Sequence, residues 1–425
     1  MESVALETSF RHINSQSIVF DGIAKRQQNQ GSTRINSMNK ATPILNQMQS
    51  LISRSVFEKL VKKYNADNNV RTFPTWSLLK VMLFAQCAGK KSLRDICIGF
   101  TSMPKRMYHL GLKGVSRNNL SHSLAQRNAG LFEDVFYALL QKVQNEAMRM
   151  PNKRFRFSNE LFSIDSTTIS VCLDVFEWAK FRTAKGGVKV HTMLDVRNQI
   201  PAFAAITPAK VHDAVPVPAM PIHSNAIYVM DRGYLSFDIL ENINENGSFF
   251  VTRLKSNSQY GIIRTMKSSI PTILRDEEIE FTGVNADRYS GPLRHVRFKN
   301  PEDGKVYDYI TNNMMLSAST IASIYKSRWD IELFFKWIKQ NLRIKSFYGT
   351  SRNAVLIQIW TAMISFLLVS YIRFLSKTAM SLIDVFRVLG SNILSDRFIN
   401  DLLCPVKTAP PRLRRCFEIQ LDFGF

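Results

Sequence analysis

The chain has 425 residues, 45% of them hydrophobic, which is enough for two or three domains with buried cores. Lys and Arg number 56 against 34 Asp and Glu, which gives a net charge of +22. This charge favours nucleic acid as a partner; an anionic membrane, or a basic protein without a polyanionic partner, is the alternative. The five cysteines form no C-x-x-C pair, and no basic segment followed by an apolar run opens the chain, so zinc modules and secretion are not expected.

The N-terminal third of the chain is predicted to be helical after an unfolded start. Residues 1–37 are rich in Gln, Asn, Ser and Arg, and their composition predicts a disordered extension. Residues 38–150 predict an all-α DNA-binding domain, in which Ser55, Thr75 and Ser92 each cap a helix. A fragment of these residues is expected to bind DNA without the rest of the chain.

A candidate recognition helix follows the glycine-containing turn at residues 111–114. The segment SRNNLSHSLAQRN has the length and polarity of the second helix of a helix-turn-helix, although an ordinary bundle helix explains the pattern equally well. The side chains that would contact DNA are Arg117, Asn118, Asn119, His122 and Arg127.

The pattern changes after Pro151, where short apolar strands alternate with helices and predict an α/β domain over residues 151–376. Short strand-like pieces at about 255–315 predict an inserted β region, and a long helix is expected from about 319 to 345. Residues 354–372 are apolar enough to span a membrane, but their Gln, Thr and Ser side chains favour a buried core helix. Residues 377–425 predict a small helical tail.

Two aspartates are expected at the ends of buried strands. Asp165 ends or follows the apolar run at 161–164, and Asp231 follows the run at 227–230. Carboxylates on neighbouring strands repel each other unless a cation lies between them, and Mg²⁺ accepts such oxygen ligands. A turn or helix cap, which is a common role for Asp at a strand end, is the alternative for each residue taken alone.

A polar stripe is predicted along one face of the long helix expected from about 319 to 345. At about 100° per residue, its members lie within about 80° of arc, beside a separate apolar face. A solvated charged face with i,i+4 pairs explains the charges, but not the aromatic residue among them. The stripe consists of Tyr325, Arg328, Glu332, Lys336 and Lys339.

These segments resemble the DDE transposases of bacterial insertion sequences, in the branch called the insertion-sequence-four family. The Y-x2-R-x3-E-x6-K signature begins at Tyr325, DRGY at Asp231 resembles the second acidic motif, and SIDST around Asp165 resembles the first. The match covers roughly residues 155–376. It implies an RNase H-like core with a β insertion and a catalytic, metal-binding triad of Asp165, Asp231 and Glu332.

The resemblance also implies the cofactor and the DNA contacts. Two Mg²⁺ ions, for which Mn²⁺ can substitute, would bind the triad. DNA would contact Tyr325, Arg328, Lys336, Lys339 and Arg232. A hairpin intermediate would need an aromatic residue in the insertion to stack on a flipped base. Because none of the five tryptophans lies there, the candidates are Phe281, Tyr289, Tyr307 and Tyr309.

The sequence therefore predicts a cut-and-paste transposase. It would bind the terminal inverted repeats of its insertion sequence, cleave the ends and join them to target DNA. We expect a homodimer in the DNA complex and a location in the bacterial cytoplasm, at the nucleoid. The alternatives are a metal-dependent nuclease without strand transfer and a non-catalytic DNA-binding regulator derived from a transposase.

Overall fold

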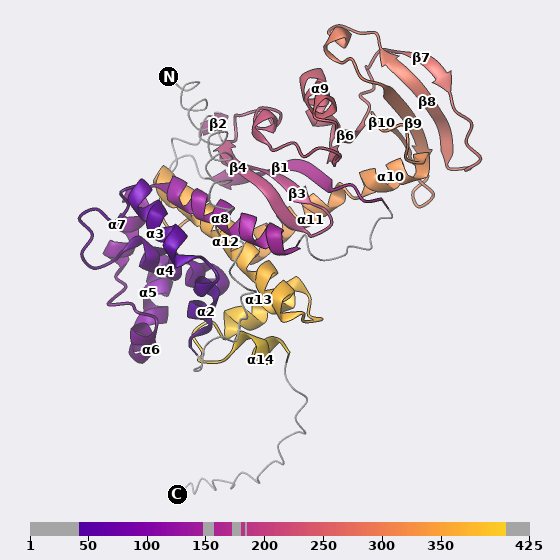
Figure 1. Ribbon diagram of the computed structural model, residues 1–425. Helices are drawn as coiled ribbons and strands as arrows, with labels where there is room; N and C mark the ends of the chain where they lie inside the picture. The colour runs from indigo at the N-terminus through magenta and orange to yellow at the C-terminus, as the bar shows by residue number, and fades with distance from the viewer. Residues whose placement is uncertain (1–41, 148–156, 172–179, 183–184, 405–425) are drawn as a thin grey trace, which may run out of the picture.

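The computed structural model describes residues 42–147, 157–171, 180–182 and 185–404. A bundle of helices packs beside one large mixed sheet, whose far end extends away from the bundle (Figure 1). The predicted N-terminal extension at 1–37 and the basic end of the chain lie outside the described residues.

The N-terminal region is helical, as predicted. Ser92 caps its helix as expected, whereas the cap before the segment VFEKL is Ser53 instead of Ser55. Thr75 does not cap its helix but is its first residue, and its backbone N–H and hydroxyl both donate to the Asp67 carboxylate. The helices are α2 (Ile44–Ser50), α3 (Arg54–Lys63), α4 (Thr75–Cys87), α5 (Leu93–Thr101), α6 (Pro104–His109), α7 (Arg117–Gln126) and α8 (Ala129–Ala147).

The core sheet has the strand order expected of an RNase H-like domain. Strand β1 pairs antiparallel with β3, which pairs with β4, and on its other side β1 runs parallel to β5 and then β6. The predicted fold class is therefore confirmed. These strands are β1 (Leu161–Val171), β2 (Lys180–Arg182), β3 (Lys185–Asp195), β4 (Ile200–Pro208), β5 (Ile227–Met230) and β6 (Phe249–Arg253).

Helices cover both faces of the parallel strands, which is why their sequences are continuously apolar. In β5, Tyr228 and Met230 pack with α9 (Phe237–Glu245), while Ile227 and Val229 pack with α10 (Ala318–Lys326) on the opposite face. All four side chains are fully buried. Burying each contributes about 1.5–3 kcal/mol, so this end of the sheet is held rigidly.

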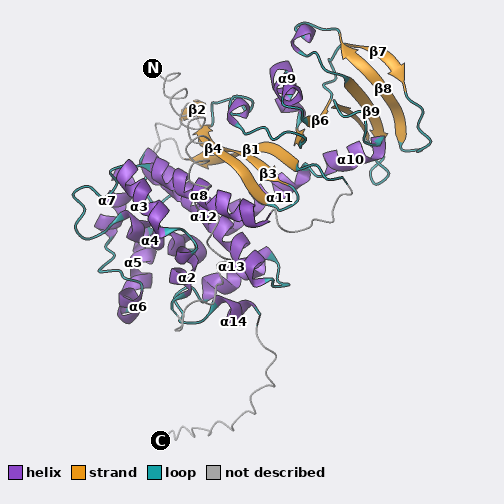
Figure 2. Cartoon of the chain, viewed as in Figure 1, coloured by secondary structure: helices purple, strands orange, loops and turns teal. Residues whose placement is uncertain are grey.

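The inserted β region continues the core sheet and does not form a second one. Strand β10 pairs antiparallel with β6, and β9, β8 and β7 follow outward, which makes a sheet of ten strands (Figure 2). A buried ion pair between Arg294 and Asp276 joins β9 to β8, with Nε to Oδ1 at 2.7 Å. The four strands are β7 (Tyr260–Thr265), β8 (Ile273–Phe281), β9 (Leu293–Lys299) and β10 (Val306–Thr311).

The long helix expected at about 319–345 is two helices, α10 and α11 (Trp329–Asn341), so that expectation was wrong. At the junction, the N–H of Ser327 donates to the carbonyl of Ile324 and that of Arg328 donates to Tyr325, a three-residue spacing that tightens the turn. The Ser327 hydroxyl also donates to the carbonyl of Ile324, at 2.6 Å. The side chain thus competes for a carbonyl that a continuous helix would use.

Helix α12 (Arg352–Ser376) runs through the middle of the helical region, against α4, α7 and α8. It is long and apolar enough to span a membrane by composition, but 89% of its most apolar window is buried inside the protein. The expectation of a core helix is therefore confirmed. The short helices α13 (Leu382–Ser391) and α14 (Ile399–Leu403) pack beside it.

Because α12 belongs to the same apolar core as α2 to α8, the N-terminal helices have no separate core. Gln86 of α4 adds a polar link, because its amide oxygen accepts from the N–H of Arg343 at 2.7 Å, just after α11. A fragment of residues 38–150, the predicted DNA-binding domain, would therefore expose the apolar surface that α12 covers.

Candidate active site

Two aspartates lie side by side where the parallel strands end their pairing. Ile164 of β1 is opposite Met230 of β5, so Asp165 and Asp231 occupy the next position on each strand. Asp231 follows the last residue of β5, as predicted. Asp165 does not end its strand, because β3 continues to pair with β1 and places Thr192 opposite Asp165.

Arg328 joins the first aspartate to the glutamate of α11. Its Nη1 lies 3.4 Å from Oδ2 of Asp165, and its Nη2 lies 2.5 Å from Oε1 of Glu332. Ser163 of β1 donates to the backbone carbonyl of Arg328 at 3.3 Å, which fixes the start of α11 against the sheet. The Arg328 side chain is only 14% exposed, so it lies between the two carboxylates and not in solvent.

Tyr325 joins the second aspartate to α10. Its hydroxyl donates to Oδ1 of Asp231 at 3.3 Å, and its ring packs on Tyr309 of β10, with the ring centroids 4.7 Å apart. Burial raises the pKa of Tyr325 to about 12, with Asp231 adding to the effect against the opposing charge of Arg328. The hydroxyl therefore remains a neutral donor at physiological pH.

The carboxyl group of Asp165 is harder to ionise than usual because it is buried beside two other carboxylates. Burial raises the pKa of Asp165 to about 6, and the negative charges of Glu332 and Asp231 act in the same direction. The backbone N–H of Ser166 and the guanidinium of Arg328 oppose this rise. The cluster is therefore one that a cation would stabilise strongly.

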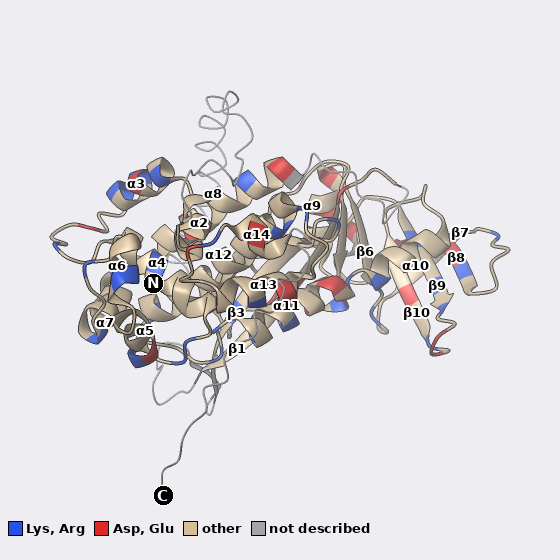
Figure 3. Ribbon diagram, turned by 90° about the horizontal axis from the view of Figure 1, so that it is seen from below, with Lys and Arg blue, Asp and Glu red and all other residues tan. Residues whose placement is uncertain are grey.

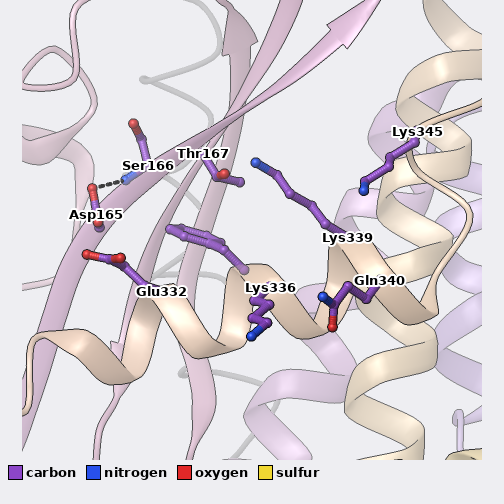
Figure 4. Close-up of a pocket in the computed structure, with 9 residues that line it drawn as sticks. Asp165, Ser166, Thr167, Glu332, Lys336, Lys339, Gln340 and Lys345 are labelled. Carbon is purple, nitrogen blue, oxygen red and sulfur yellow. Dashed lines mark hydrogen bonds between the residues drawn. The ribbon is translucent and has the colours of Figure 1, made fainter.

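A cavity of about 480 Å³ opens beside these carboxylates. Asp165 and Glu332 face one another at one end, and Lys339 and Lys345 lie toward the other (Figure 4). Burial and the nearby charge of Lys345 lower the pKa of Lys339. The cavity is lined by Asp165, Ser166, Thr167, Glu332, Phe335, Lys336, Lys339, Gln340 and Lys345.

The residues predicted to form the site lie close together in the structure, some buried and some exposed. Tyr325, Arg328 and Glu332 converge on the aspartates although Tyr325 belongs to α10, Arg328 caps α11 and Glu332 lies within α11. Arg232 is exposed immediately after Asp231. Within the described part of the chain, no three acidic, His or Cys side chains are close enough to hold a metal ion as they stand. Here Arg328 supplies the positive charge that the carboxylates need.

A second polar network supports Asp165, and sequence reasoning found only a trace of it. The backbone N–H of Ser166 donates to Oδ1 of Asp165 at 2.8 Å, and the Ser166 hydroxyl donates to Asp213 at 2.5 Å. Lys189 pairs with the same Asp213 at 2.9 Å. The signal in the sequence is the adjacent pair His212 and Asp213, which nothing local connects with Asp165.

The aromatic candidates of the insertion differ in access. Tyr289 and Tyr309 are buried, and Phe281 packs edge-on against Phe237. Tyr307 is half-buried beneath the guanidinium of Arg253, which lies 5.1 Å from the ring centroid.

Sequence reasoning did not single out Trp329 as a site residue. Its side chain is 56% exposed next to Arg328, and Leu333, one turn further along α11, is 50% exposed. The signal available in the sequence was a large aromatic residue inside the charged motif RWDIE. The guanidinium carbon of Arg328 lies 6.0 Å from the centroid of the Trp329 ring, so the indole borders the site.

Known proteins resemble this chain along most of its length. The family described as "Transposase DDE domain" matches residues 156–368, and a domain of unknown function matches residues 40–113. A protein described as a transposase in Sinorhizobium fredii is 30% identical over 312 residues, covering 72% of this chain and 85% of the relative.

Two further similarities extend the comparison. An insertion-sequence transposase of Geobacillus stearothermophilus is 28% identical over 338 residues, covering 79% of this chain and 86% of the relative. Among solved structures, a piggyBac transposase synaptic complex with hairpin DNA aligns with a TM-score of 0.44 and 13% identity, over 87% of this chain and 84% of that chain.

Proposed function

Because this chain belongs to the transposase DDE family, we propose that it excises its own insertion sequence and joins it to target DNA. The observation that carries the proposal is the convergence of Asp165 and Asp231, on neighbouring parallel strands, with Glu332 on α11. Family membership brings dependence on a divalent metal, and these three carboxylates are the proposed catalytic triad.

The donor set fits Mg²⁺, which prefers carboxylate oxygens and retains water or phosphate oxygens as further ligands. We propose two Mg²⁺ ions held by Asp165, Asp231 and Glu332, with Mn²⁺ as a substitute. Bound metal activates the attacking water or 3′-hydroxyl and stabilises the leaving oxygen. The raised pKa of Asp165, caused first by burial and then by the negative charges of Glu332 and Asp231, supports a cation here.

The remaining residues of the site act on the DNA backbone. Lys336 and Lys339 line the cavity, and Arg232 is exposed beside Asp231, so all three can pair with phosphates. Tyr325 holds Asp231 through its hydroxyl, which limits the positions that this carboxylate can adopt. Once a metal ion takes over its two carboxylate partners, Arg328 can bind a phosphate of the scissile strand as well.

The helical region is proposed to recognise the terminal inverted repeats, with residues 38–150 forming the contacts and α12 completing their core. The polar face of α7 presents Arg117, Asn118, Asn119 and His122 to solvent. Arg127 does not belong to this face, because it pairs with Asp67 and donates to the carbonyl of Phe73. Two ends must be cut together, so a homodimer on DNA follows.

Second-strand cleavage is proposed to pass through a hairpin, which requires a base to leave the stack. Stacking on an aromatic ring returns about 1–3 kcal/mol of the free energy of unstacking. Of the aromatic residues near the site, Trp329 and Tyr307 have exposed or half-exposed rings. The enzyme would act in the bacterial cytoplasm, on the DNA of the nucleoid.

The test is a cleavage and joining assay with purified full-length protein, Mg²⁺ and DNA that carries both ends of the element. Asp165→Ala, Asp231→Ala and Glu332→Ala should each abolish cleavage and leave end binding within about threefold. Glu245→Ala is the control, because this exposed carboxylate lies at the end of α9, outside the cavity.

The outcomes separate the alternatives. Cleavage without joining of a precut end would identify a nuclease, and binding without any cleavage would identify a regulator. Full cleavage by any of the three variants would remove that residue from the mechanism.

A further inference from the structure

A long stretch of the helical region carries no negative charge. Residues 96–132 contain no Asp or Glu, although acidic residues make up 34 of the 425 in the chain. The stretch includes α6 and α7, which show Lys and Arg but no acidic residue (Figure 3). A surface of this kind complements a polyanion.

Three large apolar side chains project from this stretch. Tyr108 is 83% exposed, Ile98 is 56% exposed and Met103 is 47% exposed. They come from α6, α5 and the two-residue connection between these helices, and we call them the apolar tip. The neighbouring Phe100 and Leu110 are fully buried, so the segment that carries the apolar tip is packed on the core of the helical region.

Three exposed cations belong to the same stretch of chain as the apolar tip. Lys105 lies within α6 and Lys113 precedes α7, and both are exposed without an ion pair among the described residues. Arg106 is paired with Asp396, so the negative charge of this acid beside α6 is already neutralised. Arg117, also exposed, opens α7.

We propose that the apolar tip inserts into the minor groove of the element end and bends it, while the polar face of α7 lies in the adjacent major groove. Proteins that bend DNA from the minor groove place apolar wedges between base steps and flank them with cations. A second copy of this chain would bring an equally positive surface to the contact, so charge favours DNA. This inference rests on the proposed function and adds a deformation of the DNA to it.

The experiment uses full-length protein and a duplex of about three helical turns from the element end, with dyes at its two ends. Fluorescence anisotropy gives the affinity and energy transfer gives the bend, each over a range of salt concentrations. The test variant is Met103→Ala with Tyr108→Ala. The matched control is Met315→Ala, because this side chain is 90% exposed in the connection before α10.

We expect the double variant to bind about ten- to thirtyfold more weakly and to bend the duplex less, with an unchanged salt slope. Lys105→Ala should instead lower the salt slope by about one, because it removes one phosphate contact. Since the altered side chains are exposed, the thermal midpoint of each free protein should match the parent.

Two results would overturn the inference. The first is a double variant that binds and bends the end duplex like the parent while the parent distinguishes that duplex from a scrambled one. The second is unchanged DNA binding with a loss of self-association in sedimentation, which would identify the apolar tip as a contact between copies. A parent protein that neither prefers nor cleaves the end duplex would refute the proposed function, and this inference with it.

Discussion

Replacing Arg328 by Ala tests whether its guanidinium neutralises the carboxylates of the site in the absence of a metal ion. The side chain contacts Asp165 and Glu332, and it is 14% exposed while they are 22% and 34% exposed. Breaking a buried ion pair costs about 3–5 kcal/mol. Because Glu332 is a third exposed, solvent screening reduces the expected loss of unfolding free energy to about 1–3 kcal/mol.

The same substitution should make the metal bind more tightly. Without Arg328, Asp165 and Glu332 lose their compensating charge, and a divalent ion no longer has to displace a bound guanidinium. A tenfold gain in affinity corresponds to about 1.4 kcal/mol, and we expect a change of that order. The assays are Mn²⁺ titration followed by electron paramagnetic resonance, and thermal unfolding with chelator or with metal, all without DNA.

Lys336→Ala is the matched control for Arg328→Ala. It removes a cation from the same cavity, but this side chain is exposed and forms no ion pair among the described residues. Its stability with chelator and its affinity for Mn²⁺ should stay close to the parent values. If Arg328→Ala is as stable as the parent with chelator and binds Mn²⁺ no more tightly, Arg328 does not compensate the triad.

Three further predictions concern pH, DNA and the core. In metal-free protein, the pKa of Asp165 is raised to about 6, so its stabilising contribution is present below about pH 4 and lost as pH rises through 6. Asp165→Asn should therefore stabilise the metal-free protein at pH 7 but not at pH 4, measured by thermal unfolding. Lys339→Ala should nick the first strand and stall before the hairpin, which a denaturing gel would reveal as a missing band of double length. Gln86→Leu should lower the unfolding free energy by about 1–3 kcal/mol in calorimetry, because it leaves the N–H of Arg343 without its partner; an unchanged value would show that water replaces the amide.

The local part of the site could be predicted from sequence because each motif lies on one element. Asp231 follows four apolar residues that form β5, and the spacing of Glu332 and Lys339 holds within α11. The break between Tyr325 and Glu332 could not be read from helical periodicity. It depends on the Ser327 hydroxyl and on Ser163, a residue of a distant strand.

Long-range pairings were beyond a single sequence. The contact between Arg328 and Asp165 joins residues 163 positions apart, and the one between Gln86 and Arg343 joins residues 257 apart. Nothing local distinguishes Arg328 from other cations of the stripe before the sheet and helix meet. The same reason explains why Asp165 was expected to end its strand, since only the pairing with β3 shows that the strand continues.

The position of α12 has a consequence for how the protein is made. Its residues, Arg352–Ser376, leave the ribosome after more than four-fifths of the chain, yet the helices near the N-terminus pack around them. During synthesis those early helices therefore remain incompletely packed until α12 has emerged. A premature stop codon before residue 352 should then yield a product that is degraded, and not a short competitor that occupies the element ends. Truncated products of this protein would therefore be unable to inhibit transposition by competing for the element ends.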